Sequence, residues 1–110
     1  MTEITFFNQG KKLIGIESRG HTNYDDKGYD IICAAVSVLM QSLVFGLSEI
    51  ARLPGLEIKI DDSIPLIKIT WPKKKFEKIS LLVQTVAESL KIIAADNSDY
   101  VKINTEEITQ

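Results

Sequence analysis

The chain has 110 residues, of which 45% are hydrophobic and 25% are charged. These values are typical of globular proteins and exclude a disordered or low-complexity chain, and the length predicts a single domain over 1–110. With 13 basic against 15 acidic residues, the formal net charge of −2 argues against non-specific binding of nucleic acid.

The single cysteine and the single histidine exclude an internal disulfide and a zinc site built from these residue types. Residues 1–12 lack the apolar run of a secretory signal, so we expect a cytoplasmic protein. The uncharged run 31–47 is shorter than the ~20 apolar residues that span a bilayer, which favours a buried helix and no membrane contact. Because the chain has one cysteine and one histidine, we expect no metal, and we expect no other cofactor.

The N-terminal part of the chain predicts a hairpin followed by a polar loop. Residues 4–7 and 13–17 are rich in Ile, Leu and Phe and flank a turn at 8–10, a pattern typical of two paired strands. Residues 18–29 carry Gly, Asn and Asp with little apolar content. A loop of this length is a common place for function, and it contains the only histidine, His21.

A long helix and a second hairpin come next. Asp30 stands where a helix N-cap belongs, and the apolar residues after it predict a helix that ends at the Leu-Pro-Gly sequence 53–55. Apolar and polar residues then alternate in 56–60 and again in 67–71, which predicts two strands, each with one solvated face.

The last elements are an amphipathic helix and a short strand. Apolar residues recur at three- and four-residue steps over 76–94, and 100–103 precede a polar tail. The order strand-strand-helix-strand-strand-helix-strand predicts a two-layer α/β sandwich (α+β), with two helices on a mostly antiparallel or mixed sheet. The first helix is apolar nearly all round, so its surplus face is expected to meet the second helix or a partner in a homodimer.

Cys33 and His21 are the candidate chemical groups. With Asp30 as the cap, Cys33 falls at about the third helical position, where the helix N-terminus favours a thiolate over a thiol. The loop could bring the His21 imidazole beside the sulfur, as in cysteine nucleophiles, although a lone cysteine at the start of an apolar helix is more often a small core residue. Several nearby residues could orient the imidazole, and the sequence leaves the choice open among Asn23, Asp25, Asp26, Asp30 and Ser37.

The segment Gly20-His21 together with 28–37 closely resembles the signature of the ribosomal-processing cysteine protease family, Prp. The order and spacing are the same, and one residue differs, Ile32 in place of Val. The resemblance implies that 1–110 is a cysteine protease domain with Cys33 as nucleophile and His21 as general base. Three further residues stand at the other signature positions, namely Gly20, Asp30 and Ser37.

Members of this family remove a short N-terminal extension from large-subunit ribosomal protein twenty-seven by cutting after a pair of phenylalanines, and they act as homodimers. The resemblance therefore implies a ribosomal protein substrate that binds as an extended apolar peptide. It also implies that the loop after His21 covers the peptide, with Thr22, Asn23, Tyr24 and Gly28 as its candidate contacts. This loop has fewer small residues than the glycine-rich loop of the family, which predicts a stiffer segment.

The resemblance implies the usual thiol protease chemistry. The Cys33 thiolate attacks the scissile carbonyl, amide hydrogens at the helix N-terminus stabilise the oxyanion, and His21 protonates the leaving amine. The alternative is a non-catalytic dimeric module that is associated with the ribosome and holds the same peptide, with Cys33 as a structural cysteine. Peptide cleavage distinguishes the two hypotheses.

Overall fold

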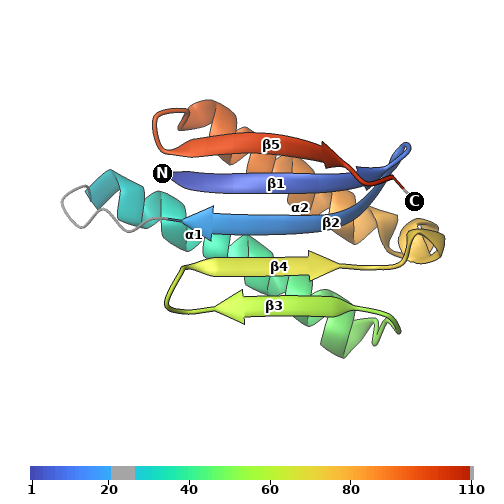
Figure 1. The fold of residues 1–110 in the computed structure, drawn as a ribbon. Helices are drawn as coiled ribbons and strands as arrows, with labels where there is room; N and C mark the ends of the chain where they lie inside the picture. Colours follow the sequence, from blue (N-terminus) through green and yellow to red (C-terminus); the bar gives the residue numbers. More distant parts are fainter. Residues whose placement is uncertain (21–26, 110) are drawn as a thin grey trace.

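A five-stranded mixed sheet carries both helices on one of its faces (Figure 1). The computed structural model describes residues 1–20 and 27–109. The strand order is β3-β4-β2-β1-β5, and every neighbouring pair is antiparallel except β1 and β5, which run parallel. The strands are β1 (Thr2–Gln9), β2 (Lys12–Gly20), β3 (Glu57–Asp61), β4 (Leu66–Thr70) and β5 (Val101–Glu107).

Two long helices form the second layer. α1 (Lys27–Phe45) continues into a π-helical turn, η1 (Gly46–Ile50), and a 3-10 turn, η2 (Lys73–Lys75), leads into α2 (Phe76–Asp96). The predicted order of elements and the predicted two-layer α+β architecture with a mixed sheet are confirmed. Only the ends of several elements differ from the sequence-based expectation.

The start of α1 differs from the prediction. The helix begins at Lys27, so Asp30 lies inside its first turn with an exposed side chain and is not the N-cap. Lys has a high helix propensity, and Gly28 costs only about 1 kcal/mol relative to alanine, so the helix can extend towards the N-terminus past the predicted cap. A carboxylate in the first turn still interacts favourably with the positive end of the helix.

The end of the first helical segment is set by a close packing contact. After η1 the chain reverses at Gly55, which has a φ of +84°. A Cβ atom at Gly55 would lie 2.6 Å from the ring of Pro72, so a side chain is excluded both by the left-handed backbone and by this neighbour. The predicted stop at 53–55 is therefore the turn that leads the chain towards β3.

The last strand is longer than its apolar residues indicate. β5 continues through the polar residues 104–107, which the sequence pattern assigns to a tail, because its backbone pairs with β1 from Thr2↔Val101 to Asn8↔Glu107. Pairing along the ladder, and not side-chain alternation, sets where this strand ends.

The core lies between the helical layer and the helix-facing side of the sheet. On α1 the buried stripe is Val36, Met40 and Leu43, at spacings of four and three residues, and Leu47 of η1 extends it. The strands β1, β2, β4 and β5 contribute side chains to the same layer, as expected from their two-residue period, whereas residues 57–60 of β3 are exposed. The fully buried residues with the largest side chains are Ile4, Ile16, Met40, Leu43, Leu47, Ile69, Val83 and Leu90.

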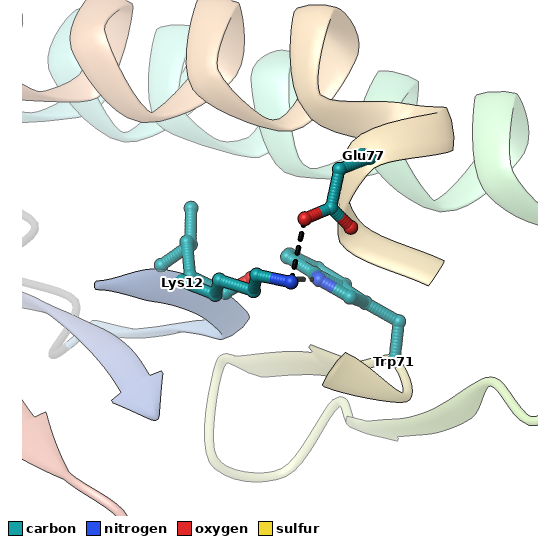
Figure 2. Close-up of polar contacts among 4 residues, drawn as sticks. Lys12, Trp71 and Glu77 are labelled. Carbon is teal, nitrogen blue, oxygen red and sulfur yellow. Dashed lines mark hydrogen bonds and ion pairs between the residues drawn. The ribbon is translucent and has the colours of Figure 1, made fainter. Parts of the chain in front are cut away.

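Trp71 connects the end of β4 to β2 at the edge of this core. Its side chain is 3% exposed, and its indole Nε1 donates a hydrogen bond to the carbonyl oxygen of Leu13 at 2.8 Å. Figure 2 shows the ion pair between Lys12 and Glu77 beside the indole, which links β2 to the first turn of α2. The hydrogen bond from Lys12 lowers the pKa of the Glu77 carboxyl, which therefore stays ionised to more acidic pH.

The outward face of α1 is apolar and exposed. Ile31, Val38 and Phe45 follow one another at seven-residue intervals, which places them on one side of the helix, and they are 73%, 63% and 58% exposed. α1 also contacts α2, and a Cβ atom on Gly46 in η1 would lie 2.8 Å from a methyl group of Leu82. The helix thus buries one stripe, touches α2 and leaves a second apolar stripe uncovered.

Taken by length and composition alone, Asp30–Ile50 is the one segment among the described residues that could cross a membrane. In the fold, however, Val36, Met40, Leu43 and Leu47 from this segment are buried in the core. This supports the interpretation of the segment as a core helix, with the difference that burial is confined to one side.

Candidate functional site

A cavity of about 320 Å³ opens at one end of the sheet, between α1 and the strand ends. The last residues of β2 and β3 meet the first residues of β1 and β4 at this edge, because these neighbouring strands are antiparallel. The strand residues that line the cavity come from these ends, and α1 closes the opposite side with four side chains, those of Cys33, Val36, Ser37 and Gln41.

Cys33 lies in the second turn of α1 and lines the cavity. Its side chain is partly buried, and its Sγ lies 3.4 Å from Oγ1 of Thr2, the first residue of β1. The predicted third helical position is wrong, because α1 begins at Lys27 and Cys33 is the seventh residue of the helix. Since the field of a helix end falls off within the first turn, the helix contributes less to stabilising a thiolate here than the sequence indicates.

Gly20 and Ser37 line the same cavity as Cys33. Gly20 ends β2, and its amide donates a hydrogen bond to the carbonyl oxygen of Pro65 at 2.9 Å, which joins β2 to the turn before β4. Ser37 follows Cys33 by one helical turn on the same face, as predicted from the spacing. Asp30, the third of the supporting candidates, has an exposed side chain and is absent from the described cavity lining.

The remaining candidates belong to the segment between β2 and α1. His21, Thr22, Asn23 and Tyr24 lie outside the described residues, and so do Asp25 and Asp26. Gly28 was expected in the loop before the helix, but it belongs to the first turn of α1. Gly20 precedes His21 directly, so the chain leaves the described part of β2 at the wall of the cavity.

The turn between β3 and β4 forms the far wall of the cavity, and no local sequence pattern indicates this role. Ile60 and Ile67 present apolar surface to the cavity, and Asp61 and Asp62 stand at the turn. The pKa of Asp61 is lowered mainly by the hydrogen bond from the Ser63 hydroxyl, at 2.7 Å, together with the backbone amides of Ser63 and Ile64. Asp61 therefore accepts hydrogen bonds within its own turn as a carboxylate.

Thr2 also lines the cavity, although its local sequence does not mark it as a site residue. It is separated from Cys33 by 31 positions, so its place at the sulfur depends on how α1 packs over the sheet. Across 1–20 and 27–109, no three His, Cys, Asp or Glu side chains lie together as a metal site requires. The described arrangement is thus a thiol with hydroxyl neighbours that faces a largely apolar cavity, which suits nucleophilic attack on a bound apolar segment.

Comparisons with known proteins point to one family. The family model described as cysteine protease Prp matches residues 1–102. The ribosomal processing cysteine protease Prp of Bacillus subtilis is 27% identical over 102 residues, which cover 86% of this chain and 88% of the relative.

Solved structures share the fold over nearly the whole chain. SMU.848 from Streptococcus mutans is 28% identical with a TM-score of 0.80, covering 98% of this chain and 96% of its own. An essential ribosomal processing protease Prp from S. aureus, solved with a substrate peptide, is 21% identical with a TM-score of 0.81, covering 96% of this chain and all of its own. The same arrangement of helices and strands therefore occurs in a protein that was crystallised with a peptide.

Proposed function

This chain belongs to the cysteine protease Prp family, and from that premise we propose that it is an endopeptidase that removes a short N-terminal extension from large-subunit ribosomal protein twenty-seven during ribosome maturation. The observation that carries the proposal is the position of Cys33, the only thiol of the chain, in the wall of the cavity at the end of the sheet. We place this activity in the cytoplasm, where ribosomes are assembled.

Cys33 is the proposed nucleophile and His21 the proposed general base. His21 accepts the proton of the Cys33 thiol, and the resulting thiolate attacks the scissile carbonyl carbon to form a tetrahedral intermediate. His21 then protonates the leaving amine, the C–N bond breaks, and water hydrolyses the thioester to release the second product.

The helix start at Lys27 changes which residues supply the proposed oxyanion donors at the helix N-terminus. Only the first few amides of a helix lack intrahelical acceptors, and among the described residues these belong to 27–29. The Cys33 amide lies beyond them. The proposed oxyanion donors are therefore the first-turn amides of α1, while Cys33 contributes its side chain.

The cavity wall supports an apolar peptide as substrate. Val36, Ile60 and Ile67 give apolar surface to the cavity that Cys33 also lines, and Ile60 lies on β3, an edge strand of the sheet. An aromatic side chain that enters the cavity removes apolar area from water on both partners, which stabilises binding by roughly 25 cal/mol per Å² before other costs. A pair of phenylalanines before the scissile bond matches this chemistry.

We expect the purified protein to cut a synthetic peptide that carries a Phe-Phe N-terminal extension, directly after the second phenylalanine. The reason is the apolar cavity beside Cys33, which an Ala-Ala version of the same peptide cannot fill. Intact mass measures both products, and the Ala-Ala peptide is expected to be cut at least about 100-fold more slowly. An uncut Phe-Phe peptide that nevertheless binds in a titration supports the non-catalytic module instead.

We further propose that the chain acts as a homodimer through the exposed stripe of Ile31, Val38 and Phe45 on α1. The stripe lies within residues 31–48, which contain no charged residue, and its three side chains are exposed. An exposed apolar stripe of this kind is typical of a surface that another copy of the chain covers.

Val38→Lys is expected to convert the dimer to a monomer, because it places a charge in the centre of that stripe. Sedimentation velocity distinguishes one chain mass from two. Leu81→Lys on α2 is the matched control, since Leu81 is also apolar and is 83% exposed, yet lies on the other helix. Dimers that survive Val38→Lys, or that dissociate equally with Leu81→Lys, would place the interface elsewhere.

A further inference from the structure

Thr2 is fixed more firmly than its position near the chain end suggests. It pairs with Gly20 of β2 on one side and with Val101 of β5 on the other, and its amide donates to the carbonyl oxygen of Tyr100 at 2.8 Å. The side chain is 3% exposed and lines the same cavity as Cys33. The Thr2 hydroxyl is therefore presented to the sulfur by a strand that has neighbours on both sides.

The 3.4 Å contact between Thr2 Oγ1 and Cys33 Sγ has a direction that depends on the state of the sulfur. In the thiol form either atom can donate the hydrogen. A thiolate has no proton, so the hydroxyl must donate to it, and hydrogen bonds to an ionised acceptor are about twice as strong as neutral ones. The contact consequently stabilises the thiolate more than the thiol.

We propose that Thr2 is a positioning residue for the Cys33 nucleophile: its hydroxyl donates a hydrogen bond to the thiolate and holds the sulfur at the cavity wall. This inference rests on the proposed protease function. The branched side chain of threonine has few χ1 rotamers, which suits a donor that must stay aimed at one atom. Thr2 thereby supplies part of the stabilisation that the second-turn position of Cys33 does not receive from the helix end.

Other charged groups near the cavity are the same in every variant proposed here. On α1 the nearest acidic residue in sequence is Asp30, and the β3–β4 turn contributes Asp61 and Asp62. Glu17 and Arg19 of β2 alternate with the cavity-lining Ser18 and Gly20, so they belong to the other face of the sheet. The Met1 amino group also remains, and so does the proposed base His21, which lies outside the described residues. A change caused by removing the Thr2 hydroxyl is thus separable from these charges.

The test measures the rate at which iodoacetamide alkylates Cys33, from about pH 5 to about pH 9, which is unambiguous because the chain has one cysteine. Thr2→Val removes the hydroxyl and keeps the shape. We expect it to move the midpoint of the alkylation profile upward by about half a pH unit or more and to lower kcat/KM for the Phe-Phe peptide about three- to tenfold, mainly through kcat.

Two further variants serve as controls. Thr2→Ser keeps the hydroxyl and is expected to stay within about twofold of the original chain in both measurements. Thr5→Val makes the same chemical change at a buried threonine of β1 on the opposite face and is expected to change neither. Intact mass confirms that all variants carry the same first residue, and circular dichroism confirms that they fold. If Thr2→Val does not fold, Thr2→Ala is used in its place, with the same expected result.

The proposal is overturned if the alkylation profile of Thr2→Val overlays that of the original chain. It is also overturned if Thr2→Ser shifts as far as Thr2→Val, because serine keeps the hydroxyl and the shift then comes from altered packing at this position. Failure of the proposed function gives a different result: the unaltered chain does not cut the peptide. The alkylation profiles still show in that case whether the Thr2 hydroxyl acts on the sulfur.

Discussion

Cys33→Ala is expected to abolish cleavage of the Phe-Phe peptide, with a loss of at least about 10⁴-fold in kcat, because no other described side chain of the cavity offers a nucleophile of comparable strength. The remaining lining consists of hydroxyl, amide, carboxylate and apolar groups, none of which is activated by a described neighbouring base. The time course of product formation, followed by intact mass, measures the loss.

The fold is expected to survive this substitution. Cys33 is only partly buried, and alanine is a good helix former, so the free energy of unfolding should change by less than about 1 kcal/mol. His21→Ala provides the companion measurement: cleavage falls by about 10²- to 10⁴-fold while the thiol can still be alkylated. Cleavage that persists in Cys33→Ala would rule out Cys33 as the nucleophile.

Trp71→Ala is expected to give the largest loss of stability, about 3 to 5 kcal/mol, with a fall in Tm on the order of 15 °C or more. The substitution leaves a cavity where an almost fully buried indole packs, and it removes the hydrogen bond from the indole Nε1 to the Leu13 carbonyl. Denaturant unfolding followed by circular dichroism measures the change.

A graded series identifies the source of the Trp71 effect. Trp71→Phe keeps most of the apolar area and loses the donor to Leu13, so it should cost about 1 to 3 kcal/mol. Leu81→Ala, at a highly exposed position of α2, should stay within about 0.5 kcal/mol. If Trp71→Ala unfolds within about 1 kcal/mol of the original chain, the indole is not part of the cooperative core.

Periodicity accounts for how much of the fold could be predicted. Two-residue alternation identified the strands around Ile16 and Ile69, and three- and four-residue spacing identified α2, since both patterns follow directly from which side chains are buried. The ends of elements were less predictable. The start of α1 at Lys27 depends on small propensity differences, and the polar end of β5 on pairing with a strand almost 100 positions away.

The candidate site could likewise be predicted only where its residues are close together in the sequence. Local sequence pattern placed Ser37 on the same helix face as Cys33, and both line the cavity. Thr2 and Ile60 come from distant parts of the chain, and nothing in their local sequence marks them. Contacts of this kind depend on the tertiary arrangement of β1, β3 and α1, which periodicity does not specify.

The place of β1 between β2 and β5 couples the site to the order in which the chain is synthesised. β1 comes from the start of the sequence, yet its partner β5 is Val101–Glu107, and the Thr2 amide is held by Tyr100. During synthesis β1 can pair with β5 only after nearly the whole chain has been made. Such non-local pairing is slow to form. The cavity wall that Thr2 provides thus gains its second neighbouring strand only after the segment that carries Cys33 has been translated, so a partly synthesised chain lacks this support for the contact between Thr2 and Cys33.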